Sequence, residues 1–202
     1  SYPRDLTGYG ANPPQANWPD NARIALQFVL NFEEGSENSI LHGDAASEAF
    51  LSEIIGADAR EGVRHMSMES FYEYGSRVGI RRIRETLARN DIKASFFVPA
   101  VVAELHPEEQ KAVVDDGHEV GIHGWIHEFN SDLTETEERD IMMRAADVLE
   151  RTSGKRPVGM RTPSWDFTPY TLKICREMEL LYDSSLMADD EPYELLEDGE
   201  PT

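Results

Sequence analysis

Short apolar segments alternate with segments of helical periodicity along most of this chain, and no other feature limits its fold as strongly. The apolar segments of strand length are residues 23–32, 94–98, 119–122 and 158–160, and another begins at residue 181. The segments with helical spacing are residues 79–90, 107–115, 134–153 and 170–178. Such alternation is typical of parallel strands connected by helices. We therefore expect an α/β fold built on a parallel sheet.

The longest helical segment carries signals for both of its ends. Thr134 is followed three residues later by Glu137, which is the pattern of a capping box at the start of a helix. Gly154 follows the last residue of the pattern, and glycine readily adopts the left-handed conformation that ends many helices. The sequence thus predicts a helix from Thr134 to Ser153.

The chain divides into an arm and one domain. Residues 1–22 are polar and contain four prolines, which predicts an extended N-terminal arm. Residues 23–202 carry the alternating segments and are expected to form a single catalytic domain, since a chain of 202 residues suffices for one core. Within that domain, residues 33–70 are polar and irregular, and excursions of this length are often functional.

Charge and cysteine content exclude several kinds of partner and site. The formal net charge is -20, so the chain would repel nucleic acid and anionic membranes. No apolar run approaches the ~20 residues of a membrane span, and residues 1–22 lack the apolar run of a secretory signal. We expect a cytoplasmic protein. Cys175 is the only cysteine, so a metal would have to be bound mainly by histidine and carboxylate.

Polar clusters follow four of the predicted strands. They are residues 31–35, residues 123–127, residues 161–165 and the residues from Asp183 onward. In α/β folds the active site lies at the carboxyl ends of the parallel strands. We therefore expect these clusters to assemble one site.

Two histidines, His123 and His127, directly follow the strand at residues 119–122. If the turn between them is helical, both lie on one face. Two neutral imidazoles at this spacing can bind one divalent ion. Surface or helix-capping histidines are the alternative, and the spacing alone gives the two interpretations about equal weight. The position directly after a buried strand favours the metal.

Two adjacent carboxylates, Glu33 and Glu34, follow the first predicted strand. One could bind a metal ion while the other takes a proton from water. Adjacent carboxylates at the end of a buried strand repel each other, and a cation would relieve that repulsion. The alternative is a pair of solvated acids in a turn, which is common in so acidic a chain.

The two remaining clusters contain an arginine, an aspartate and aromatic residues. Arg161 at a strand end can orient a carboxylate through its fork of donors, or it can form a structural salt bridge. Trp165 can form an apolar wall of a ligand site or cap the core. Asp183 can orient Arg161, line the pocket or serve only as a turn residue.

On these residues the sequence resembles the polysaccharide deacetylase family across roughly residues 23–190. Four motifs occur in the family's order. They are Asn31-Phe-Glu-Glu-Gly35, similar to Thr-Phe-Asp-Asp-Gly; His123-Gly-Trp-Ile-His127, similar to H-x-x-x-H; Arg161-Thr-Pro163, similar to R-x-P; and Tyr182-Asp-Ser-Ser. The resemblance implies a distorted (β/α) barrel, for which a full ring needs about 250 residues. The family's final Leu-His pair is absent, so we expect this chain to lack the C-terminal part of the barrel.

Within the family, the sequence resembles the peptidoglycan deacetylase-like group and the bacterial allantoinases. Residues 2–10, 41–44 and 63–70 look especially like the allantoinases. That group, as far as the resemblance goes, lacks the second histidine of H-x-x-x-H and is independent of metal. This chain keeps both histidines, which favours a bound metal.

The resemblance assigns roles to the candidate residues. Aligning the first motif residue by residue makes Glu34 the metal ligand beside His123 and His127, and makes Glu33 the catalytic base. A register shifted by one would make Glu33 the ligand and place Phe32, which cannot act as a base, in the base position; we prefer the first alignment. One divalent metal, most simply zinc, is implied. Arg161 and Asp183 complete the expected catalytic group, and the residues expected to contact substrate are Trp125, Pro163, Trp165 and Tyr193.

The predicted function is metal-dependent hydrolysis of a non-peptide carbon–nitrogen bond in an N-acetylated glycan or a related amide. The alternative is hydrolysis of a small cyclic amide or ureide. A pocket closed by residues 33–70 would favour small substrates, whereas an open groove would favour glycans. A third interpretation is a non-catalytic homologue that binds carbohydrate or a partner, since glutamates replace the family's aspartates. The resemblance also implies a homo-oligomer.

Overall fold

A five-stranded parallel sheet forms the centre of the computed structural model, which describes residues 5–50, 54–197 and 200–201. The strands are β1 (Phe28–Asn31), β2 (Ala94–Val98), β3 (Glu119–Ile122), β4 (Gly159–Met160) and β5 (Tyr182–Asp183). Each strand pairs in parallel with the next one in the sequence. The order therefore never reverses, unlike that of a doubly wound sheet, and matches the single winding of a (β/α) barrel.

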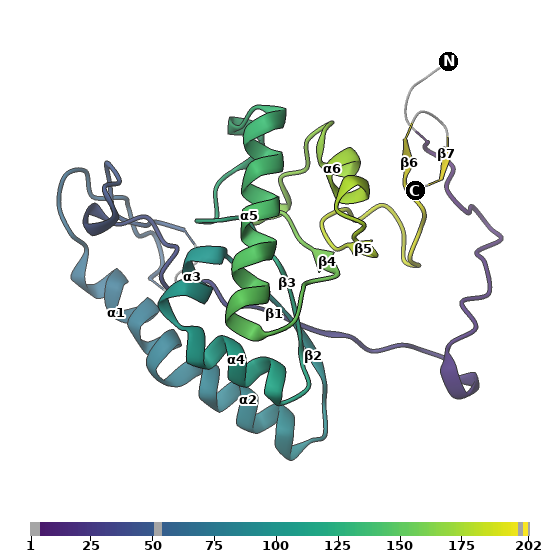
Figure 1. Cartoon of the computed structure of the whole chain (residues 1–202), viewed down its shortest axis with the longest axis horizontal. Coiled ribbons are helices and arrows are strands. Elements are labelled where there is room, and N and C mark those ends of the chain that lie inside the picture. Colours follow the sequence, from purple (N-terminus) through teal and green to yellow (C-terminus); the bar gives the residue numbers. More distant parts are fainter. Residues whose placement is uncertain (1–4, 51–53, 198–199, 202) are drawn as a thin grey trace.

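Six α-helices connect or flank these strands within the described residues. They are α1 (Met66–Tyr74), α2 (Ile80–Arg89), α3 (Ala100–Leu105), α4 (Pro107–Asp115), α5 (Glu135–Ser153) and α6 (Thr171–Glu177). A single π-helical turn, η3 (Gly75–Gly79), joins α1 to α2. Short 3-10 turns occur at η1 (Pro19–Asn21), η2 (Ile40–His42), η4 (Asn130–Asp132) and η5 (Pro163–Trp165), and β6 (Leu196–Glu197) pairs with β7 (Glu200–Pro201). Figure 1 shows α5 in front of the sheet, with α3 and α4 beside it.

Side-chain alternation along the strands separates a core face from a site face. Phe96 and Val98 of β2 are fully buried and join one apolar cluster with Ile122 of β3 and Leu149 of α5. Burying a side chain of this size stabilises the fold by about 1.5–3 kcal/mol. Phe97 points to the opposite face, because successive side chains of a strand alternate. That second face carries the polar residues described below.

The predicted helix at residues 134–153 is confirmed together with its caps. The hydroxyl of Thr134 accepts a hydrogen bond from the backbone N–H of Glu137 at 3.3 Å, and the Glu137 carboxylate accepts one from the backbone N–H of Thr134 at 2.8 Å. Gly154 ends the helix with a φ of 82°. Local signals therefore define this element, which packs against α3, α4 and β3.

The first strand is shorter than the apolar run that predicted it. Residues 23–27 of that run lie outside the ladder, and Ile24 and Leu26 are 74% and 76% exposed. β1 lies at the edge of the described sheet and pairs only with β2 there, which leaves the apolar side chains before it without a covering layer. None of the helices in the described part of the chain is long and apolar enough to span a membrane.

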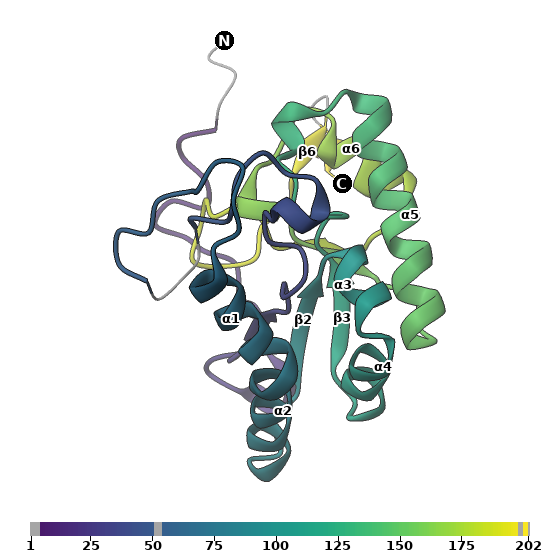
Figure 2. The same cartoon turned by 90° about the vertical axis from the view of Figure 1, so that its left-hand side faces the viewer.

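Two irregular segments complete the fold. Residues 5–22 of the predicted N-terminal arm are exposed except for the half-buried Tyr9 and Trp18, and the Tyr9 hydroxyl donates a hydrogen bond to the carbonyl of Pro192 at 3.4 Å. After β1, the chain folds over the end toward which β2 and β3 point, as the dark blue ribbon in Figure 2 shows. The long polar excursion therefore lies at the carboxyl edge of the sheet, where the polar clusters were expected to meet.

Candidate active site

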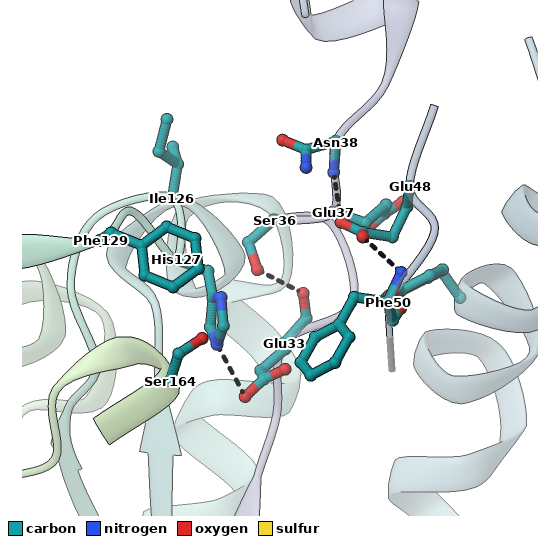
Figure 3. Close-up of a pocket in the computed structure, with 11 residues that line it drawn as sticks. Glu33, Ser36, Glu37, Asn38, Glu48, Phe50, Ile126, His127, Phe129 and Ser164 are labelled. Atoms are coloured by element: carbon teal, nitrogen blue, oxygen red, sulfur yellow. Dashed lines mark hydrogen bonds and ion pairs between the residues drawn. The ribbon is translucent and has the colours of Figure 1, made fainter. Parts of the chain in front are cut away.

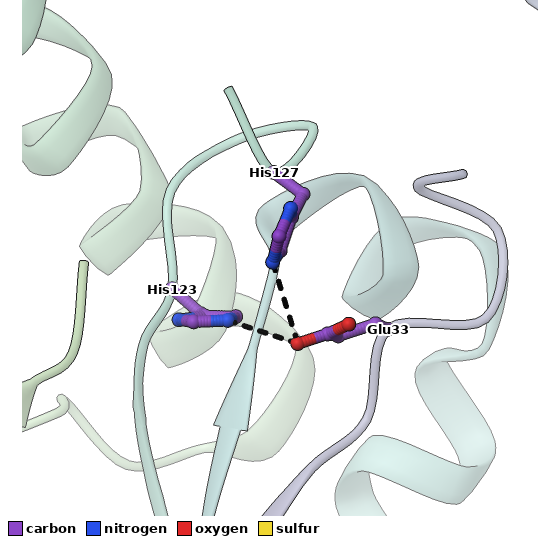
Figure 4. Close-up of side chains that lie close together, drawn as sticks. All are labelled: Glu33, His123 and His127. Carbon is purple, nitrogen blue, oxygen red and sulfur yellow. Dashed lines mark hydrogen bonds and ion pairs between the residues drawn. The ribbon is translucent and has the colours of Figure 1, made fainter. Parts of the chain in front are cut away.

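Three side chains from distant parts of the sequence converge at the carboxyl edge of the sheet. Oε1 of Glu33 lies 3.0 Å from Nε2 of His123 and 3.5 Å from Nε2 of His127 (Figure 4). One potential ligand atom from each residue lies within 4.8 Å of the other two. A carboxylate with two imidazoles is a donor set that suits zinc and related divalent ions.

His123 is held in one tautomer by the backbone of the next loop. Its Nδ1 lies 2.8 Å from the carbonyl oxygen of Arg161, so Nδ1 carries a proton and donates it. In the neutral ring, Nε2 then presents a lone pair to the carboxylate of Glu33. Two lone pairs 3.0 Å apart repel unless a proton or a metal ion lies between them. His123 is 1% exposed, so water cannot solvate this edge of the ring.

The chain between the two histidines forms a tight turn, so the condition of a helical turn between them is not met. Gly124 and His127 have positive φ angles of 70° and 62°, which a helix does not allow. The Glu128 carboxylate folds back and accepts hydrogen bonds from the backbone N–H groups of Trp125 and Ile126 at 2.7–3.1 Å. The left-handed residues therefore direct both imidazoles toward Glu33. We refer to residues 123–133 as the turn segment.

The two adjacent glutamates point in different directions, and this corrects the preferred alignment. Glu33 faces both histidines, whereas Glu34 packs against Gly75 in the π-helical turn. A Cβ atom added to Gly75 would lie 2.0 Å from Oε1 of Glu34, so only glycine leaves room for this side chain. Glu34 is therefore not placed to join the histidines, and the carboxylate beside them is Glu33, as in the shifted register.

The charges at the site are strongly coupled. Burial raises the pKa of Glu33, but hydrogen bonds and charge from His123 and His127 outweigh it and hold this pKa far below its ordinary value of 4.5. Burial lowers the pKa of His127, while its hydrogen bond to Glu33 raises it to a net value above 6.5. Burial raises the pKa of Glu34, and the neighbouring charge of Glu33 adds to the rise. Glu33 is therefore the anion of the group, and it stabilises positive charge on its partners.

Arg161 is oriented by partners other than the expected aspartate. Its guanidinium donates hydrogen bonds to the carbonyl and hydroxyl of Ser184, at 3.1 and 2.7 Å, and to the side-chain oxygen of Asn31 at 3.4 Å. Asp183 instead accepts hydrogen bonds from the backbone N–H and hydroxyl of Ser185. Of the three roles that the sequence left open for Asp183, the structure shows that of a turn residue, and its catalytic role stays a prediction.

A cavity of about 150 Å³ opens beside Glu33 and His127 (Figure 3). Residues 36–50, which we call the covering segment, supply much of its wall. The remaining wall comes from α1, the turn segment and η5. The lining residues are Glu33, Ser36, Glu37, Asn38, Glu48, Phe50, Tyr72, Ile126, His127, Phe129 and Ser164.

None of the four residues expected to contact substrate is among those that line this cavity. Trp125 packs beside the core, with the Arg144 guanidinium 4.4 Å from its ring centre. Pro163 is buried, and Trp165 is half-exposed with a φ of 57°. The hydroxyl of Tyr193 accepts a backbone hydrogen bond from its own segment. Their substrate-binding roles stay predictions.

The sequence signal for the lining residues was the long irregular excursion as a whole. Its length indicated function, and five of the lining residues come from the covering segment. Individual positions such as Phe50 and Glu48 carried no recognisable motif. Their place in the wall depends on how the excursion folds back over the sheet.

Comparison with known proteins shows the family. Residues 64–182 match the sequence profile of the polysaccharide deacetylases. A Schizosaccharomyces pombe protein assigned to that class is 32% identical over 203 residues, which cover 94% of this chain and 62% of that protein. The chain therefore belongs to the polysaccharide deacetylase family, whose members are hydrolases acting on carbon–nitrogen bonds other than peptide bonds.

Solved structures agree on the fold. The Puue allantoinase superposes with a TM-score of 0.91 and 45% identity, covering 100% of this chain and 67% of that chain. A Pseudomonas aeruginosa PAO1 protein assigned to the polysaccharide deacetylases superposes with a TM-score of 0.88 and 47% identity, covering 96% of this chain and 64% of that chain. The predicted α/β fold of the polysaccharide deacetylase type is confirmed. The chain spans about two thirds of the length of each of these relatives.

Proposed function

We propose that the protein is a metal-dependent hydrolase that cleaves a carbon–nitrogen amide bond. The observation that carries the proposal is the convergence of Glu33, His123 and His127 at the carboxyl edge of the sheet. Three protein ligands with further positions open to water and substrate are the pattern of catalytic zinc sites, whereas structural zinc sites have four protein ligands.

The residues present fit a divalent ion. Tautomer fixation by the Arg161 carbonyl leaves Nε2 of His123 as a lone-pair donor, and Nε2 of His127 faces the same carboxylate oxygen. A bound ion at this place would polarise the amide carbonyl and lower the pKa of a bound water. Glu33 supplies the negative charge that offsets such an ion. The cavity beside Glu33 and His127 would hold the substrate near the group.

The first candidate substrate is an N-acetylated glycan. Membership of the polysaccharide deacetylase family supports it. On such a substrate the protein would remove an acetyl group from a sugar nitrogen, and the sugar would extend from the cavity toward solvent.

A small cyclic amide or ureide is the second candidate. The covering segment closes the cavity on one side, and a space of about 150 Å³ accommodates a small molecule more easily than a glycan. The similarity of the whole chain to an allantoinase of known structure favours the same class. An acidic wall that includes Glu37 and Glu48 would accept hydrogen bonds from the N–H groups of such a ligand.

The test uses the full-length protein. We expect elemental analysis to find about one divalent ion per chain, and turnover to stop on chelation and return with zinc. Parallel assays with N-acetylglucosamine oligomers and with cyclic imides and ureides would distinguish the two substrates. Turnover that is unaffected by complete removal of metal would contradict the metal-dependent reaction. Absence of both metal binding and turnover would support the non-catalytic interpretation.

A further inference from the structure

A carboxylate that has no role in the group just described is completely buried beneath it. Glu138, in the first turn of α5, is 0% exposed. No ion pair between described side chains involves it. Removing an ionised carboxylate from water costs several kcal/mol unless hydrogen bonds replace the lost hydration. A fully buried glutamate is therefore expected to have a structural or functional reason.

Hydrogen bonds to Glu138 come from two different loops. Oε1 accepts from the side-chain amide of Asn130 at 3.0 Å and from the hydroxyl of Thr171, and Oε2 accepts from the hydroxyl of Thr168 at 2.7 Å. The hydroxyl oxygen of Thr168 already accepts a hydrogen bond from the backbone N–H of Tyr170, and that of Thr171 accepts one from the backbone N–H of Thr168. Their protons are thus available to the carboxylate, and the network is complete with Glu138 ionised.

The two loops are those that build the candidate active site. Asn130 belongs to the turn segment, which carries His127 and Phe129 into the cavity. Thr168 follows η5, the turn after β4 that places Ser164 in the cavity wall, and Thr171 is the first residue of α6, where that loop ends. A second bridge joins the same loops, since the backbone N–H of Ser131 donates to the Asp166 carboxylate at 2.8 Å. Glu138 therefore connects the loop after β3 with the loop after β4.

We propose that Glu138 is a positioning residue, which fixes the turn segment to the loop after β4 and thereby holds His127 in place. The helix start favours this carboxylate, because the partial positive charge of the first turn faces it. The zinc part of the proposal rests on the proposed function, whereas the loop-fixing part does not. Partners outside the ligand shell typically change metal affinity by about 10–100-fold when removed.

Hydrogen exchange of the metal-free full-length protein tests the loop-fixing part. Glu138→Leu removes every acceptor and keeps a buried side chain of similar length. We expect it to speed exchange at residues 127–133 and 166–171, while β2 and β3 stay protected. Glu138→Gln keeps an acceptor for Asn130 and should largely restore protection. Gln110→Leu is the matched control, because Gln110 is also a 0% exposed polar side chain on a helix, but its side-chain amide has no hydrogen-bond partner among the described residues.

Single-donor variants keep the test decisive if Glu138→Leu fails to fold. Asn130→Ala should speed exchange in residues 127–133 alone, and Thr171→Val should do so in residues 166–171 alone. A uniform rise in exchange across the domain in these variants would overturn the proposal and leave Glu138 a general stabilising residue.

Zinc titration provides the second measurement. We expect Asn130→Ala and Glu138→Leu to weaken zinc binding about 10-fold or more, with Glu138→Gln and Gln110→Leu close to the unmodified protein. Unchanged zinc affinity in a folded Glu138→Leu protein would overturn the link to His127. If the unmodified protein binds no zinc, the proposed function fails, and the exchange measurement still decides the loop-fixing role.

Discussion

The turn segment and the covering segment meet at the same cavity, but they are held in place in different ways. Asn130 of the turn segment is buried and bonds to a fully buried carboxylate of α5. In the covering segment, Glu48 accepts three backbone hydrogen bonds, from Asn38, Ala49 and Phe50, within the segment itself. One loop is therefore fixed to a buried carboxylate of α5, whereas the other is bonded to itself, to residues 60–62 and to Tyr72 of α1.

Exposure of apolar side chains differs less between the two segments, since Ile126 and Phe129 of the turn segment are also 51% and 52% exposed. Leu41 and Phe50 of the covering segment are each 65% exposed, so little apolar burial stabilises that segment. Segments with few buried contacts open at low free energy, whereas segments bonded to the core open only with it. We propose that the turn segment maintains the geometry of the proposed metal ligands and that the covering segment adapts to the substrate. The predictions below test this division, from the largest expected effect to the smallest.

Replacing a histidine of the turn segment should have the largest effect. His127→Asn removes the imidazole but keeps a residue that tolerates the positive φ of 62°. We expect zinc affinity to fall by more than about 100-fold, measured by competition titration, because a direct ligand exceeds the usual effect of a supporting residue. His42→Asn replaces an exposed histidine within the covering segment; it is the control and should not change zinc affinity. An equal loss of zinc affinity in both variants would contradict the different roles of the turn segment and the covering segment.

The two adjacent glutamates provide the next test. Glu33→Gln removes the charge beside both histidines and should weaken zinc binding by about 100-fold, since the neutral amide keeps one weakly binding oxygen. Glu34→Gln is the matched control, because this side chain packs against Gly75 instead. We expect its zinc affinity to stay within about threefold of the unmodified protein. The reverse ranking would restore the register that makes Glu34 the ligand.

These two glutamates also show where sequence reasoning reaches its limit. The helix at Glu135–Ser153 could be predicted because its capping box and terminal glycine are local signals. The choice between Glu33 and Glu34 could not, because it depends on which side chain faces inward at a strand end. A change of one residue in register reverses that direction. Contact of Glu34 with Gly75, far away in the sequence, decides the question.

Loop geometry limited the rest of the site prediction. The spacing of His123 and His127 correctly indicated that they lie close together, but the turn between them is set by positive φ angles and by Glu128. The lining residues of the covering segment follow no periodic pattern. Only its length marked them, because irregular backbone is positioned by tertiary contacts rather than by local propensity.

Acidity should affect the metal-free and zinc-bound proteins in opposite ways. In the metal-free protein, the contacts that raise the pKa of His127 stabilise the fold fully at pH values below the pKa of His127 in the unfolded chain, near 6.5. This stabilisation is lost as the pH rises through the pKa of His127 in the folded protein. The contacts that lower the pKa of Glu33 stabilise the fold at pH values above the pKa of Glu33 in the unfolded chain, near 4.5. This stabilisation is lost as the pH falls through the pKa of Glu33 in the folded protein. The pair therefore stabilises the metal-free fold most between pH 4.5 and 6.5.

Zinc requires a neutral His127, so the stabilisation by zinc should grow as the pH rises through the raised pKa. Thermal unfolding at about pH 6 and about pH 8, with chelator and with zinc, measures both trends. In the metal-free protein, His127→Asn should reduce the change in melting temperature between about pH 6 and about pH 8. A zinc-induced rise in melting temperature that is larger at the lower pH would contradict the assignment of His127 as a ligand.

The smallest effect is expected from the covering segment. Glu48→Ala removes a carboxylate that accepts backbone N–H groups at 2.8–3.1 Å, and the free energy of unfolding should fall by about 1 kcal/mol or less. Exchange in residues 38–50 should speed up, and KM should rise with little change in kcat, because substrate contacts rather than reacting groups are disturbed. Zinc affinity should stay unchanged.

Asp58→Ala is the control for that variant, because it removes the same charge from an exposed position outside the cavity wall. It should leave exchange and KM as they are. If Glu48→Ala lowered zinc affinity as strongly as Asn130→Ala, the covering segment would be part of the ligand scaffold. The two loops would then be one rigid unit, and adaptation to the substrate would have to come from elsewhere in the protein.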